Sequence, residues 1–193
     1  MGERRYRLSR LLRGLSGSEA EAARTVPAGA LIVRLDEAVA PLASDLRDLG
    51  QTWRYRVGPA LLDHADPAFV EFTATVGRDA LRPLSPVRVT ATRMPDHVTI
   101  SWLRRSRVDG DAWEPIEIPL GESVERYEID ILQGGNVLRT LHATDATVTY
   151  LADQELADFG SPQSVLSLRV VQMSSVAGRG LESVNAVAVA PCV

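Results

Sequence analysis

Short segments that alternate apolar and polar residues dominate the second half of the chain. Turn residues separate most of these segments, and the clearest turn is Gln133-Gly134-Gly135-Asn136. Alternation places every second side chain on one face of a strand, so each segment is expected to bury one face. The segments are 87–91, 98–102, 127–131, 137–139, 146–150, 166–170 and 186–189. The pattern predicts seven short strands that form two antiparallel sheets packed face to face.

The order and spacing of these strands fit a fibronectin type III-like β-sandwich. Trp102 on the second strand and Tyr127 on the third are predicted to lie in the core, because large aromatic side chains bury much apolar area. Pro83 and Pro86 mark the boundary of this domain, since proline disfavours both helix and central strand. We therefore expect a sandwich over residues 85–193, preceded by a separate module over residues 1–84.

The first 84 residues carry a weaker pattern. Strands are predicted at 6–8, 30–35, 53–57 and 69–75, and short helical turns are expected at 18–23 and 41–46. The expected fold of this part is a smaller, mostly-β module with a little helix. The chain as a whole is thus predicted to be all-β.

Composition argues against several classes of protein. The net charge of −4 argues against a general nucleic-acid binder. Cys192 is the only cysteine, so no disulfide within the chain and no cysteine-based metal site is expected. A run of about 18 apolar residues does not occur, and no membrane-spanning helix is predicted.

No catalytic, cofactor or metal site is predicted, and we expect the chain not to be an enzyme. His64, His97 and His142 fall on separate loops or strand ends, whereas metal ligands must converge. The Gly-x-Ser-x-Gly motif of hydrolases is absent, and Gly178-Arg179-Gly180 is too short for a phosphate loop. These glycines are expected to serve turn geometry, because glycine adopts positive φ at little cost.

Residues 104–113 form the most distinctive charged segment. One interpretation is a solvated surface whose arginines pair with nearby acids, and the other is a contact surface for another protein. The second follows from the enrichment of arginine and tryptophan at interfaces. Asp109 and Asp111 are expected to form a turn rather than a calcium site. The candidate interface residues are Arg104, Arg105, Arg107, Asp109, Asp111, Trp113 and Arg179.

Several motifs resemble one known family in their order along the chain. They are Tyr6-Arg7-Leu8, Gly17-Ser18-Glu19, Tyr55-Arg56-Val57-Gly58-Pro59, Ser101-Trp102-Leu103-Arg104-Arg105, Pro119-Leu120-Gly121-Glu122, Glu125-Arg126-Tyr127, Asp158-Phe159-Gly160 and Gln172-Met173-Ser174. Together they look like the C-terminal region of the phage-type tail-tip (baseplate hub) protein of gene transfer agents and related siphophages, whose longer members carry a TIM-barrel-like domain. Ser18 departs from the family's Gly-Thr-Glu. Family proteins are much longer, so the chain resembles a terminal fragment or a split product, and any hydrolase activity of the upstream region is not carried over.

The resemblance implies a structural component of a phage-like tail tip, in a virion or virus-like particle made in the bacterial cytoplasm. Its implied partners are other tail or baseplate proteins in a symmetric ring, which needs a heterologous interface that repeats by rotation. No cofactor and no nucleic-acid partner is implied. The alternative is a tail-borne binding module that contacts a glycan or protein of the host cell surface, with Trp113 stacking on a sugar ring. On the first hypothesis, alanine at Arg104 and Arg105 should impair assembly without unfolding the domain.

Overall fold

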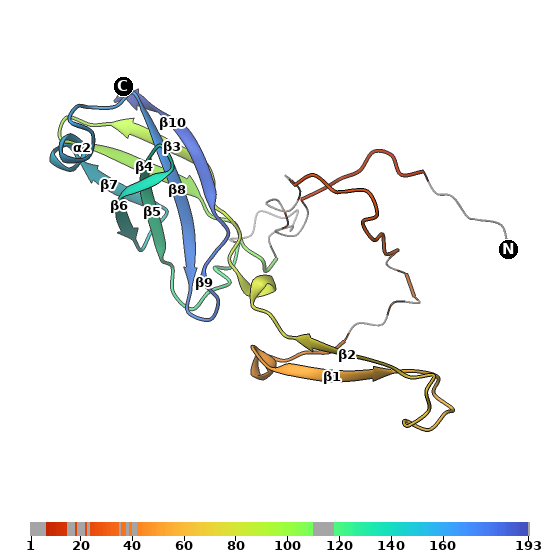
Figure 1. Cartoon of the computed structure of the whole chain (residues 1–193). Coiled ribbons are helices and arrows are strands. Elements are labelled where there is room, and N and C mark those ends of the chain that lie inside the picture. Colours follow the sequence, from red (N-terminus) through yellow and green to blue (C-terminus); the bar gives the residue numbers. More distant parts are fainter. Residues whose placement is uncertain are drawn as a thin grey trace. The chain divides into compact units, whose positions relative to one another are not determined.

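The computed structural model describes residues 7–14, 18, 22, 24–34, 36–37, 39, 42–109 and 118–192. The chain divides into two compact units, and Figure 1 labels the strands that each contains. One consists of Met1–Ala28 with Arg82–Val193, and the other consists of Gly29–Leu81. Each unit is described by itself below.

The first unit contains a β-sandwich. One sheet has the order β3 (Val87–Arg93), β4 (His97–Leu103) and β7 (Thr147–Leu151). The other has the order β6 (Asn136–Ala143), β5 (Tyr127–Gln133), β8 (Val165–Ser174) and β10 (Ser183–Pro191), and β9 (Gly178–Arg179) pairs with β8. The end of β10 runs parallel to β3, so β10 joins one edge of each sheet. All seven predicted strands are present, and the mainly-β, fibronectin type III-like sandwich is confirmed.

The core lies between the two sheets and follows the alternation of the sequence. The fully buried apolar side chains include Val98, Ile100, Ile129, Ile131, Leu166, Leu168 and Val170. Trp102 and Tyr127 are both buried, as predicted, and their rings meet edge to face with centroids 5.0 Å apart. The Tyr127 hydroxyl donates a hydrogen bond to Glu125 Oε1 at 2.7 Å. Burial, followed by this carboxylate, raises the pKa of Tyr127, so the phenol stays neutral in the core.

The sequence pattern does not predict α2 (Ala152–Phe159), which follows β7 and ends at Gly160 with φ +75°. The only buried residue of this helix is the carboxylate Glu155. Its most deeply buried side chain is therefore ionic, and Phe159 is the apolar residue of the helix that packs against the core. An eight-residue helix spans only about two turns, which is too short for its apolar periodicity to stand out in the sequence.

The second unit contains β1 (Thr52–Val57) and β2 (Val70–Thr75), which form an antiparallel two-stranded sheet as predicted at 53–57 and 69–75. The short 3-10 helix η1 (Leu46–Asp48) precedes β1, and the short 3-10 helix η2 (Asp79–Leu81) follows β2. η1 begins later than the helical turn predicted at 41–46, because the Asp45 carboxylate accepts from Arg47 N and caps the turn there.

Two strand predictions in the first 84 residues are wrong. Described residues 30–34 form no strand, and neither do described residues 7–8. Leu31 is 94% exposed, so this apolar run enters no core formed by the described residues. Of the helical turn predicted at 18–23, Ala22 is helical and its N–H donates to Ser18 O at 2.9 Å; residues 19–21 and 23 lie outside the described residues.

Candidate functional site

Two loops meet at one end of the sandwich. They are the loop after β4 and the loop after β8, and Met173 N near the end of β8 donates to Arg126 O at the end of the first loop at 2.8 Å. The hydroxyls of Ser123 and Ser175 lie 3.2 Å apart. The structure therefore places residues 174–180 at the same end of the sandwich as the arginine-rich segment that begins at residue 104. We call residues 103–109, 118–126 and 174–180 the loop end.

Arg104 and Arg105 brace the arginine-rich loop from within. Arg104 donates from Nη1 to Pro119 O and from Nη2 to Ile118 O, both at 2.9 Å. Arg105 donates from Nε to Ser85 O at 2.8 Å and from Nη2 to Ser85 Oγ at 2.7 Å. The planar guanidinium group suits this role because its several donors reach two acceptors at once. These two arginines therefore hold the loop in shape.

The arginine-rich segment also contains acidic residues and a third arginine, Arg107. Arg107 Nη2 donates to Glu122 Oε1 at 2.9 Å, which is one of the local ion pairs that the solvated-surface interpretation predicts. Asp109 is exposed and adopts φ +49°, a left-handed conformation that aspartate tolerates in turns. Asp111 and Trp113 lie outside the described residues. The interface role of this segment stays a prediction.

Arg179 is fixed on the outer face of the second sheet. It donates from Nη1 to Glu128 Oε2 and from Nη2 to Asp130 Oδ2, both at 2.8 Å. Gly178 has φ +77°, which confirms the turn role predicted for this glycine. A Cβ at Gly180 would lie 2.7 Å from Gln172 O, so Gly180 allows two backbone segments to approach closely.

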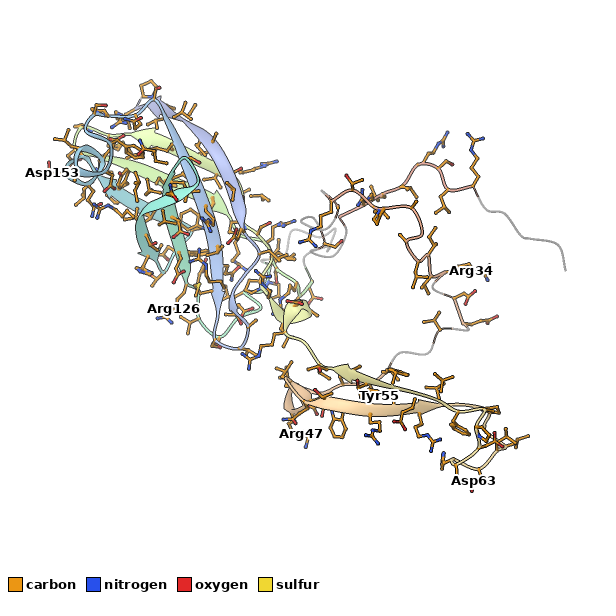
Figure 2. All side chains as sticks on the ribbon, in the orientation of Figure 1. Arg34, Arg47, Tyr55, Asp63, Arg126 and Asp153 are labelled. Atoms are coloured by element: carbon orange, nitrogen blue, oxygen red, sulfur yellow. The ribbon has the colours of Figure 1, made fainter. Side chains whose placement is uncertain are left out.

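A groove of about 590 Å³ opens at the loop end beside the starts of β5 and β7. Its polar lining includes Ser123, Arg126, His142, Thr144, Asp145 and Ser175. Figure 2 shows Arg126 extending away from the sandwich. Hydroxyl groups and charges of both signs line the groove, so it suits a polar, hydroxyl-bearing ligand or a polar loop of a partner protein.

Exposed apolar side chains gather at the same end, and no pattern in the sequence indicates them. They are Leu103, Val108, Ile118, Val124 and Val176. Single apolar residues in polar loops carry no periodicity, and one exposed apolar residue is ordinary on a protein surface. The signal is their convergence on one end of the sandwich, which only the strand order reveals.

The described residues contain no group of three His, Cys, Asp or Glu side chains that could hold a metal ion. His97 Nδ1 lies 2.6 Å from Asp96 Oδ1, and the His64 ring meets Phe69 edge to face. His142 is exposed on β6. Across the described part of the chain, no helix has the length and apolar character that crossing a membrane requires.

Comparisons with known proteins give structural neighbours only. No protein-family model and no curated protein matches the chain. Among solved structures, domains d3–d4 of the rat CD45 extracellular region align with 12% identity and a TM-score of 0.38, covering 96% of this chain and 84% of theirs. The FN5 domain of Drosophila Lar aligns with 17% identity and a TM-score of 0.32, covering 56% of this chain and 97% of its own. At these values the similarity says nothing about partners or activity.

Proposed function

We propose that the chain is a structural component of a phage-like tail tip or baseplate, equivalent to the C-terminal region of the hub protein, and acts by protein–protein assembly. The observation that supports assembly is the loop end, where exposed apolar side chains sit on a loop that Arg104 and Arg105 hold in shape. A loop ordered before binding loses less conformational entropy on association. The order of the family-like motifs supports the tail-tip location.

Arg104 and Arg105 are less suitable than the exposed apolar residues as candidates for the contact with a partner protein. Arg104 and Arg105 donate to acceptors of their own chain, so replacing them by alanine would loosen the loop as well as alter its surface. Exposed valines at the loop end are the more direct test of a contact. Val124 and Val176 are suited to this, because no core packing depends on them.

Aspartate at Val124 and Val176 should reduce incorporation into particles about a hundredfold, since a charge buried in an apolar contact is strongly unfavourable. The matched control is aspartate at Leu156 and Val165, which are exposed on α2 and at the start of β8, away from the loop end. Particle yield and immunogold electron microscopy with antibody against this chain provide the measurement, and circular dichroism checks folding. Label confined to the tail tip is expected. Normal yield from the loop-end variant, or accessible particles without label, would contradict the proposal.

A second candidate function is a tail-borne binding module, which the polar groove favours. On this hypothesis the purified chain binds recipient-cell envelopes, and alanine at Arg126 or Trp113 removes the binding because a charged donor or a stacking ring is lost. A pull-down with envelope fractions measures this, with alanine at Asp153, an exposed residue of α2, as the control. If the wild-type chain did not bind the envelopes, the binding-module hypothesis would be rejected and only the assembly role would remain.

A further inference from the structure

The β1–β2 sheet has two faces of opposite character. The cross-strand pairs Trp53–Ala74, Tyr55–Phe72 and Val57–Val70 alternate with the pairs Thr52–Thr75, Arg54–Thr73 and Arg56–Glu71. Paired residues point to the same side of a sheet, and successive pairs point to opposite sides. One face is therefore entirely apolar and the other is polar. We call the first, formed by Trp53, Tyr55, Val57, Val70, Phe72 and Ala74, the apolar face.

The described residues of this unit leave the apolar face exposed. Trp53 is 48% exposed, Val57 56%, Val70 66% and Phe72 41%, and no residue of either strand is buried. The Tyr55 and Phe72 rings stack on each other with centroids 5.3 Å apart, in the middle of the face. A two-stranded sheet is marginally stable in water and gains stability when its hydrophobic face is covered.

The polar face is satisfied within the sheet. Arg54 Nε lies 3.5 Å and Arg56 Nε 3.7 Å from the Glu71 carboxylate. The hydroxyls of Thr52 and Thr75 lie 2.8 Å apart. This face needs no partner, so contacts with another molecule are expected on the apolar side.

We propose that the apolar faces of two copies of this chain pack against each other and form a symmetric dimer. The inference goes beyond the proposed tail-tip role, because it concerns the other unit and names a second copy as the partner. Two-fold contacts, in which the same patch is used twice, are the commonest way in which identical chains associate.

The exposed area supports this occupant. With side chains of the size of valine and the aromatic residues, the exposed fractions leave on the order of 400 Å² of apolar surface per copy. Two copies would then bury about 800 Å² of apolar surface. Because interfaces are about 60% apolar, the whole contact would cover roughly 1,300 Å², which lies within the range of stable complexes.

The distribution of side-chain bulk along the face also supports a two-fold contact. With the strands of the two copies antiparallel across the interface, the central Tyr55–Phe72 pair of each copy meets its own equivalent on the axis. The Trp53–Ala74 pair, one large and one small residue, then lies over the Val57–Val70 pair of the other copy. Such matching of large against small volumes keeps two packed sheets at an even separation of about 10 Å.

Cross-linking of the full chain tests the geometry. In a Cys192→Ser background, Tyr55→Cys should give a covalent dimer with a short bismaleimide, because the equivalent residues face each other across about 10 Å. Thr73→Cys on the polar face is the matched control and should give no covalent dimer, because the two cysteines then lie on the outer sides of the packed sheets. Equal cross-linking at both positions, or none at Tyr55→Cys, would overturn the proposal.

Sedimentation equilibrium tests the association itself. The unmodified chain should dimerise, and serine at Trp53 and Phe72 should weaken dimerisation about a hundredfold, whereas serine at Arg54 and Thr73 should leave it unchanged. Hydrogen exchange of the unmodified chain checks the location, since amides of β1 and β2 should become more protected as concentration rises. A monomer at all concentrations would overturn the dimer. Because this test needs no particles, its failure beside tail-tip immunogold label would leave the proposed function standing.

Discussion

Replacing Trp102 by alanine is expected to lower the free energy of unfolding of the sandwich by about 3–5 kcal/mol, the usual cost of removing a large buried aromatic side chain. Trp102 is 3% exposed and packs edge to face on Tyr127. Its removal leaves a cavity between the two sheets and takes away the ring against which Tyr127 is positioned. A loss of this size is a large part of the total stability of an ordinary domain.

Urea denaturation followed by far-ultraviolet circular dichroism measures this effect. Two controls isolate its cause. Trp102→Phe keeps a ring in the core and should cost about 1–2 kcal/mol, because most of the buried volume is retained. Leu103→Ala changes the next residue of β4, which is half exposed, and should cost less than about 1 kcal/mol. If Trp102→Ala destabilised the chain no more than Leu103→Ala, Trp102 would not be a central part of the core.

The sandwich could be predicted from sequence because alternation is a local property. Val98, Ile100 and Trp102 lie on one strand at every second position, and this spacing alone decides which side chains face the other sheet. The strand prediction at 30–35 was wrong because strand pairing, unlike alternation, is not a local property. An apolar run becomes a strand only where a neighbouring strand accepts its hydrogen bonds, and the run itself does not reveal whether one is present.

The loop end could be predicted only in part. The pattern identified Arg104 and Arg105 as unusual, but their acceptors are mostly backbone carbonyls, such as Ile118 O and Pro119 O. Every residue carries a carbonyl, so the sequence does not indicate which one a guanidinium will reach. The grouping of Val124 with Val176 likewise depends on which loops meet, which follows from the strand order and not from either loop.

Helix α2 is held to both sheets by ion pairs, which a sequence pattern based on hydrophobicity does not reveal. Glu155 accepts hydrogen bonds from Arg93 Nη1 at 2.7 Å and Nη2 at 2.9 Å, and Arg93 lies on β3 of the first sheet. Asp158 accepts from Arg139 Nε at 2.7 Å and Nη2 at 2.8 Å, and Arg139 lies on β6 of the second sheet. α2 thus ties the two sheets together through two bidentate ion pairs.

Both carboxylates favour the charged form in the folded state. The hydrogen bonds from Arg93 lower the pKa of Glu155, and those from Arg139, with a further one from the Tyr150 hydroxyl, lower the pKa of Asp158. The unfolded chain therefore binds these protons more readily than the folded chain does. The stabilisation is fully present above the unfolded pKa values, about 4 for both groups, and is lost as the pH falls through the lowered folded values.

Glutamine at Glu155 should lower the free energy of unfolding at pH 7 by about 2–4 kcal/mol, because it leaves Arg93 without its buried counter-charge. Asn at Asp158 should act in the same direction and by less, since Asp158 is less deeply buried. The double variant should also lose less stability than the wild-type chain between pH 6 and pH 3, because the two groups that titrate are gone. Urea midpoints across this pH range measure both effects, and Asp153→Asn, an exposed carboxylate on the same helix, is the control that should match the wild-type profile. A double variant as sensitive to acid as the wild-type chain would show that the ion pairs of α2 are not what acid breaks.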